Sequence, residues 1–134
     1  MKLNKNIFFS AVLFCAVLSL TGCMEWDYGD VVEDFNATGS GLFITNEGNF
    51  QYGNATLSYY DPATNQVQNE VFFRANGMRL GDVAQSMSIY DNKGWIVVNN
   101  SHVIFAIDLN TFKEVGRIED LTSPRYIHFL SDEK

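Results

Sequence analysis

The sequence predicts an all-β protein, a β-propeller of four-stranded antiparallel blades, of which this chain of 134 residues holds about two as an N-terminal fragment. The first observation is that four short runs rich in β-branched and aromatic residues follow one another between residues 84 and 120, separated by turns of Gly, Asn, Asp and Ser. The second is that the pattern recurs earlier and later in the chain at a spacing of roughly 40–50 residues, which is typical of propeller blades. An ordinary β-sandwich with similar hairpins is the alternative architecture.

The chain begins with a short basic segment and an apolar run. Lys2 and Lys5 precede Ile7–Leu20, which is too short for a membrane span and has the length of a signal-peptide core. The residues L-T-G-C that end at Cys23 resemble a bacterial lipobox, in which the cysteine thiol is lipidated and the chain is cleaved ahead of it. We therefore expect residues 1–22 to be a lipoprotein signal peptide and the acyl chains on Cys23 to anchor the mature protein in a membrane.

Residues 23–40 are acidic and lack a strand pattern, so we expect them to form a tether between the lipid and the folded part. Glu25, Asp27 and Asp30 resemble the acidic surface-export signal of Bacteroidota lipoproteins, although a plain solvated linker explains them equally well. Loss of residues 1–22 removes two lysines and no acidic residue, so the net charge changes from −7 to −9. Nucleic acid repels such a chain, so we expect no nucleic-acid partner.

The predicted strands form two groups within residues 41–134, the part expected to contain the blades. The earlier group is a blade without its inner strand, and its members are Leu42–Asn46, Ala55–Asp61 and Gln66–Phe73. The later group is a complete blade, and its members from the inner strand outward are Ala84–Tyr90, Trp95–Asn99, His102–Asp108 and Lys113–Ile118. Tyr126–Leu130 is predicted to be the inner strand of a third blade.

Sequence correspondences connect the groups. Three pairs of segments align: Gly41–Asn46 with Gly94–Asn99, Leu57–Thr64 with Ile104–Thr111, and Met87–Gly94 with Ile127–Lys134. Asp61 and Asp108 open equivalent turns in this alignment, and Asp opens such turns by accepting a backbone N–H two residues further on. Turn formation therefore explains these two carboxylates better than catalysis does.

Two loops are longer than a hairpin needs, and they define the predicted ligand face. They are residues 46–54 and 74–82, and blade geometry brings them to the same face as residues 99–101 and 122–125. Amides, arginines and aromatic rings on one face suit a polar ligand that contains a ring. The residues predicted to bind it are Asn46, Asn49, Phe50, Gln51, Tyr52, Asn76, Arg79, Asn100 and Arg125. Ordinary variation of surface loops is an equally good explanation of their length.

Known catalytic patterns are absent from the sequence, so we expect neither an enzyme nor a bound metal or cofactor. His102 and His128 both fall in predicted strands, and no Cys or carboxylate follows at metal-ligand spacing.

Two segments carry a resemblance to a known family. Phe43–Asn46 resembles the YVTN signature, and Ile104–Thr111 resembles the V-x-V-I-D-x-x-T segment of the same repeat, whereas Val97–Asn100 departs from the signature where Thr is expected. Residues 41–134 are thus similar to YVTN-repeat (YncE-like) propeller lipoproteins of Bacteroidota. The acidic tether is also similar to that of the cobalamin-binding surface propellers that cap a TonB-dependent transporter.

The resemblance implies a surface lipoprotein of the outer membrane that captures cobalamin or another corrinoid and passes it to a TonB-dependent transporter. A glycan-binding or adhesin propeller is the alternative. A propeller enzyme that uses a quinone cofactor or a metal is a third hypothesis, disfavoured because the sequence lacks ligand clusters.

Overall fold

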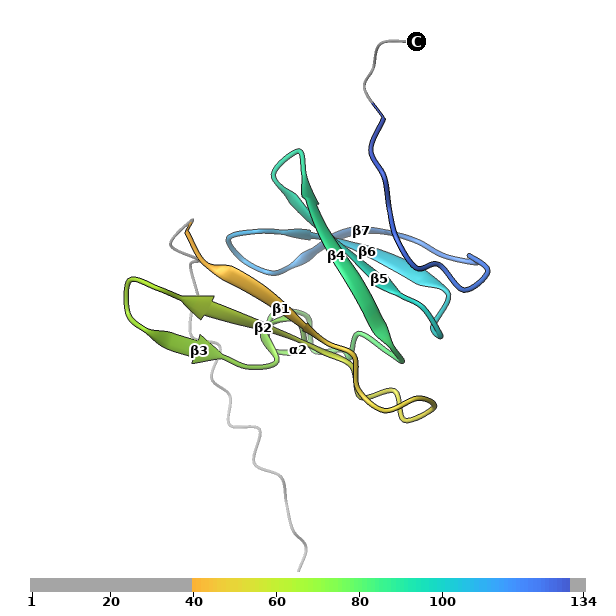
Figure 1. Ribbon diagram of the computed structural model, residues 1–134, viewed down its shortest axis with the longest axis horizontal. Coiled ribbons are helices and arrows are strands. Elements are labelled where there is room, and N and C mark those ends of the chain that lie inside the picture. The colour runs from red at the N-terminus through yellow and green to blue at the C-terminus, as the bar shows by residue number, and fades with distance from the viewer. Residues whose placement is uncertain (1–39, 131–134) are drawn as a thin grey trace, which may run out of the picture. The chain divides into compact units, whose positions relative to one another are not determined.

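The computed structural model describes residues 40–130, so the predicted signal peptide, Cys23 and the acidic tether up to residue 39 lie outside the described residues, as does the end of the predicted blade region. The described part consists of two antiparallel sheets (Figure 1). The first has the order β1-β2-β3, with bounds Leu42–Asn46, Thr56–Asp61 and Gln66–Gln68. The second has the order β4-β5-β6-β7, with bounds Ala84–Tyr90, Lys93–Val98, Val103–Asp108 and Glu114–Ile118. This confirms the predicted all-β fold with two blade-like sheets, which do not form a closed ring.

The second sheet is the predicted meander, in which each strand pairs with the next along the chain. Its strand ends differ slightly from the prediction. β6 begins at Val103 rather than His102, because His102 has a left-handed backbone with φ 58° and belongs to the preceding turn. The placement of His102 in a strand was therefore wrong.

The prediction of one strand over residues 66–73 was also wrong. β3 ends at Gln68, and the short helix α2 follows at Val71–Asn76. The chain leaves the strand at Glu70, whose φ of 55° is incompatible with a ladder. Residues 71–73, with the sequence V-F-F, favour a strand, but burial overrides this preference. The helix turns Phe72 into the core, where its ring lies 5.1 Å from that of Phe105.

Residues 126–130 do not form a strand in the described part of the chain, which corrects the assignments of Tyr126–Leu130 and of His128. The segment lies instead against the second sheet. The Phe129 ring stacks on that of Tyr90 with centroids 4.2 Å apart, and the Ser86 hydroxyl donates to the carbonyl of Arg125 at 2.8 Å. Side-chain contacts with β4 hold it there, and among residues 40–130 its backbone joins neither sheet.

One hydrophobic core lies between the two sheets. It contains Ile96, Val98 and Ile107 from the second sheet and Leu57 from the first, all fully buried. An aromatic cluster joins the sheets: the Phe112 ring, from the turn between β6 and β7, lies 5.8 Å from that of Phe43. The described residues thus form one packed unit rather than two independent hairpins.

The turns opened by Asp61 and Asp108 form as predicted. Oδ1 of Asp61 accepts the N–H of Ala63 at 2.8 Å, and Oδ1 of Asp108 accepts those of Asn110 and Thr111 at 3.0 and 2.8 Å. The pKa of the Asp108 carboxyl is lowered, chiefly because the Thr111 N–H stabilises the carboxylate. Both aspartates therefore have a turn-forming role in the structure.

Candidate functional site

The predicted loops converge on the side chain of Asp82, which is only 8% exposed. Its Oδ2 accepts the backbone N–H of Gln51 at 2.7 Å and also accepts Nδ2–H of Asn100. Its own N–H donates to Oγ of Ser101 at 2.8 Å. Asp82 belongs to one loop, and its carboxylate accepts hydrogen bonds from two others. It therefore fixes the three loops relative to one another.

The loop between β1 and β2 has its own internal structure. The N–H of Tyr52 donates to the carbonyl of Asn49 at 3.0 Å, and Oδ1 of Asn54 accepts the N–H of Asn49 at 2.8 Å. Gln51 has a φ of 68°, which turns its N–H inward to Asp82. The same turn leaves Phe50 63% and Tyr52 77% exposed, so two aromatic rings project from a loop whose backbone is held in place.

Backbone contacts extend this arrangement to the loop before β4. Ala55 donates its N–H to the carbonyl of Gly81 at 3.0 Å, and Asn100 donates its N–H to that of Asp82 at 3.1 Å. Gly81 has a φ of 117°, and a Cβ there would lie 2.3 Å from Oγ of Ser101. Only glycine fits this close approach without moving the loop.

The loop after β7 joins through Asn99. Its Nδ2–H donates to the carbonyl of Pro124 at 2.8 Å, which places the exposed Arg125 next to the loop that carries Asn100. Together, the loops at residues 49–54, 81–83, 99–101 and 122–125 form one surface, the loop face. Of the predicted ligand residues, it carries Asn49, Phe50, Gln51, Tyr52, Asn100 and Arg125.

Two predicted ligand residues have structural contacts elsewhere. Asn46 lies in β1, and its Nδ2 donates to the hydroxyls of Thr56 and Ser58 in β2, each at 2.9 Å. Asn76 ends α2 and joins it to the second sheet, because its side chain donates to the carbonyl of Phe112 at 3.0 Å and accepts the N–H of Glu114 at 2.8 Å. Asn76 is thus engaged between α2 and β7 and does not belong to the loop face.

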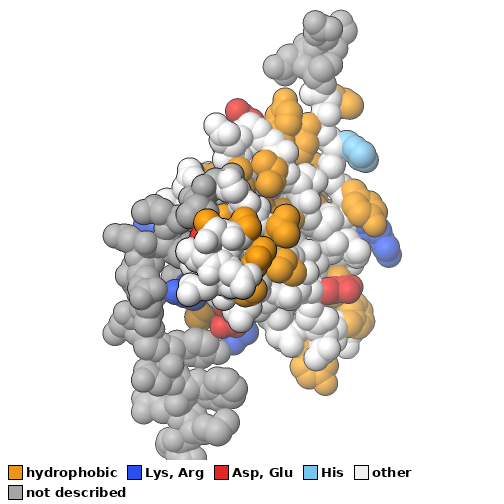
Figure 2. All heavy atoms as spheres, turned by 60° about the vertical axis from the view of Figure 1, so that its left-hand side comes forward, with side chains coloured by type: hydrophobic (Ala, Val, Ile, Leu, Met, Phe, Trp, Pro, Cys, Tyr) orange, Lys and Arg blue, Asp and Glu red, His pale blue; other side chains and the backbone are white. Residues whose placement is uncertain are grey.

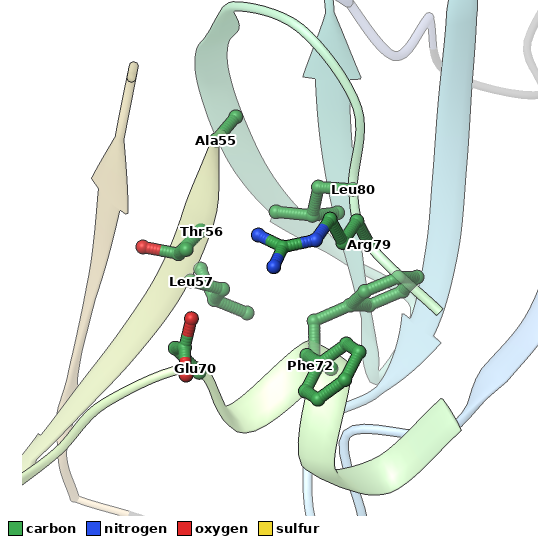
Figure 3. Close-up of a pocket in the computed structure, with 8 residues that line it drawn as sticks. Ala55, Thr56, Leu57, Glu70, Phe72, Arg79 and Leu80 are labelled. Atoms are coloured by element: carbon green, nitrogen blue, oxygen red, sulfur yellow. The ribbon is translucent and has the colours of Figure 1, made fainter. Parts of the chain in front are cut away.

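Arg79 lies beside a cavity of about 10 Å³ between α2 and β2, which has room for one water molecule (Figure 3). Figure 3 shows its side chain pointing toward Thr56 and Leu57, with Glu70 on the same side. Its guanidinium carbon lies 5.8 Å from the centroid of the Phe73 ring, a cation–π distance. Arg79 therefore packs on the helix, two residues before the chain enters the loop face.

Sequence reasoning missed Asp82 as a site residue, although it ends one of the long loops. Its Oδ1 is buried and has no hydrogen-bond partner among the described residues, while Oδ2 has two. The sequence does show an acidic residue between Gly81 and the start of β4. The two residues that donate to it, Gln51 and Asn100, are distant in sequence, so their contact could not be predicted. The arrangement can hold exposed aromatic rings and amides in fixed positions on one face.

Two further properties bear on function. Among residues 40–130, no cluster of three or more His, Cys, Asp or Glu side chains has a geometry that could hold a metal ion. No helix in that same range has the length and apolar character required to span a bilayer.

Comparison with known proteins identifies one domain family. The model of the family described as Domain of unknown function (DUF5074) matches residues 40–133, which include both sheets and the whole loop face. None of the curated proteins compared with the chain matches it. Because the match extends over most of the chain, the protein belongs to the DUF5074 family.

Proposed function

We propose that this protein is a surface-exposed lipoprotein of the outer membrane that captures a nutrient ligand, with cobalamin or another corrinoid as the best candidate, for a TonB-dependent transporter. The main support for this proposal is a pair of exposed rings, Phe50 and Tyr52, on a loop held by the buried carboxylate of Asp82. A binding protein needs such rigidity, because a loop that is ordered in advance loses less conformational entropy when the ligand binds.

The chemistry of the loop face suits a corrinoid. A corrinoid has a broad ring that aromatic side chains can cover, and amide side chains that can exchange hydrogen bonds with Asn, Gln and Arg. Asn49, Asn100 and Arg125 supply such groups on the same loop face as the two rings. The resemblance of Phe43–Asn46 to the YVTN signature supports the same assignment, and we expect no catalytic activity.

Calorimetric titration of the full chain with cobalamin tests the proposal. Tyr52→Ala should weaken binding about tenfold, because it removes a ring that is 77% exposed and covers the ligand. We expect a similar loss for Arg125→Ala, because Arg125 is the exposed arginine of the loop face and an unpaired ligand amide costs about 1–3 kcal/mol. Arg79 packs on α2 outside the loop face, so Arg79→Ala should change binding little. Lys113→Ala, on an exposed residue outside the loop face, is the matched control and should bind like the wild type. Absence of heat with any corrinoid at micromolar concentration would reject a corrinoid as the ligand.

The membrane anchor has its own test. Cys23→Ala should abolish both lipidation and cleavage of residues 1–22, because the thiol is the acylation site. Cells grown with labelled palmitate should incorporate label into the wild-type protein and none into Cys23→Ala. Equal labelling of the two proteins would remove the lipoprotein assignment without affecting the ligand proposal.

A glycan-binding or adhesin function is the second candidate. The high exposure of Phe50 and Tyr52 favours it, because exposed aromatic rings beside amides also stack on sugar rings. The same titration, performed with oligosaccharides in place of cobalamin, distinguishes the two functions.

A further inference from the structure

Asn76 is the last residue of helix α2, and its side-chain amide is fully engaged in hydrogen bonds. Its Nδ2 donates to the carbonyls of Phe72 and Phe112 at 2.8 and 3.0 Å, and its Oδ1 accepts the N–H of Glu114 at 2.8 Å. A primary amide has two N–H donors and one oxygen acceptor. The donors and the oxygen of Asn76 thus all have partners, which ties the end of α2 to the start of β7.

The next residue, Gly77, makes this position chemically sensitive. Asn76 and Gly77 form the one Asn-Gly pair in the sequence. Such pairs deamidate most readily, because glycine has no side chain to block the approach of its backbone nitrogen to Cγ of the asparagine. In the structure the Gly77 N–H donates instead to the carbonyl of Phe73 at 2.8 Å, and its φ of 67° belongs to the turn that closes α2. The nitrogen and the carbon that would react are therefore each held by other partners.

Deamidation of this pair needs only water as a co-reactant. The Gly77 nitrogen loses its proton and attacks Cγ of Asn76, which closes a succinimide ring. The bond from Cγ to Nδ2 breaks, and Nδ2 takes up a proton and leaves as ammonia. Water then opens the ring at either carbonyl, so that aspartate or isoaspartate replaces the asparagine. In sum, one amide and one water become one carboxylic acid and one ammonia.

The products cannot keep the contacts of Asn76. An ionised carboxylate has no N–H to donate, so it would face the carbonyl oxygens of Phe72 and Phe112 with a negative charge and no hydrogen bond. Isoaspartate also lengthens the backbone at the end of the helix. Either product would therefore remove the link between α2 and the turn before β7.

We propose that Asn76 is a deamidation site that the native contacts of α2 block, and that its modification keeps α2 detached once the helix has opened. Many hydrophobic side chains lie at the surface in Figure 2, but those that attach α2 are buried, since Val71 and Phe72 are 3% and 1% exposed. Opening of the helix withdraws both from the core, and only then can the pair react. The proposal rests on α2 alone and is independent of the ligand.

The rate of deamidation in the full wild-type chain tests the first part. Trypsin cuts after Arg74 and Arg79 and releases residues 75–79, in which mass spectrometry distinguishes asparagine from the acidic products. Because only the opened fraction of α2 reacts, we expect conversion in the folded chain to be at least about tenfold slower than in concentrated urea. Equal rates in the two conditions would overturn the proposal.

Two phenylalanine variants relate the reaction to the packing of α2. Phe72→Ala removes a buried side chain of the helix and should raise the rate without urea toward that of the unfolded chain. Phe50→Ala removes the same ring from a position that is 63% exposed, so it is the matched control and should react like the wild type. Equal acceleration by both variants would show that the contacts of α2 are not the block.

Asn76→Asp, which reproduces one product, tests the second part. Trypsin should cut this variant at Arg74 and Arg79 about tenfold faster than it cuts the folded wild type, because α2 is detached. Asn92→Asp makes the same change in the exposed turn between β4 and β5 and should be cut like the wild type. If Asn76→Asp resists trypsin as the wild type does, the proposal is wrong. No ligand takes part in these measurements, so failure here leaves corrinoid binding unaffected.

Discussion

Phe112→Ala is expected to lower the free energy of unfolding by about 3–5 kcal/mol, the usual cost of deleting a buried phenylalanine ring. Phe112 is 1% exposed, and its ring centroid lies 5.5 Å from that of Tyr59 and 5.8 Å from that of Phe43. The ring comes from the second sheet and both neighbours come from the first, so alanine leaves a cavity where the two sheets meet. Pulse proteolysis of the full chain in increasing urea measures the change.

The matched control is Phe50→Ala, because Phe50 is 63% exposed. Surface substitutions of this kind change stability by about 0.5 kcal/mol or less. Phe112→Leu should fall between the two, since leucine fills part of the space. A change below about 1 kcal/mol for Phe112→Ala would contradict the packing of the two sheets through this ring.

Asp82→Ala should release the loop face. The substitution removes the acceptor of the Gln51 N–H and of the Asn100 side chain, and hydrogen bonds to a charged group contribute about 1.5–3 kcal/mol each. The loop between β1 and β2 would lose its attachment to the loop before β4. We expect limited proteolysis to cut near Phe50 in this variant and not in the wild type, and we expect corrinoid affinity to fall at least as much as in Tyr52→Ala.

Asp82→Asn is the control that separates the hydrogen bonds from the charge. Asparagine keeps one side-chain oxygen, which can still accept from Gln51 and Asn100, and places its amide nitrogen where the unpartnered Oδ1 lies. Its loop should therefore be cut more slowly than that of Asp82→Ala. If both variants resist the protease like the wild type, Asp82 does not organise the loop face.

The sequence alone predicted the parts of the fold that depend on neighbouring residues. β4 was predicted with the bounds Ala84–Tyr90, and β1 with the bounds Leu42–Asn46, because alternation and turn residues operate within a few positions. The turns at Asp61 and Asp108 were predicted for the same reason, since each carboxylate accepts from residues two or three positions away.

Burial overrode local preference at other positions. Val71–Asn76 has strand-forming residues but forms a helix, because Val71 and Phe72 reach the core that way. The turn after β6 places Phe112 at a φ of 57°, which is unusual for a bulky residue, and burial of its ring between the sheets offsets the strain. Asn65, which follows the equivalent turn of the first sheet, has nearly the same φ of 56° and shows that the turn itself favours this conformation.

The candidate site also has features that the sequence predicted and features that only the tertiary structure decided. Sequence predicted that the long loops share one face, because connections of the same type emerge on the same side of a blade. Only the tertiary structure decided that Asn76 joins α2 to the second sheet and that Asp82 is the centre of the loop face. The physical reason is separation along the chain: Asp82 lies 31 residues from Gln51 and 18 from Asn100, and it meets them only once both sheets have packed.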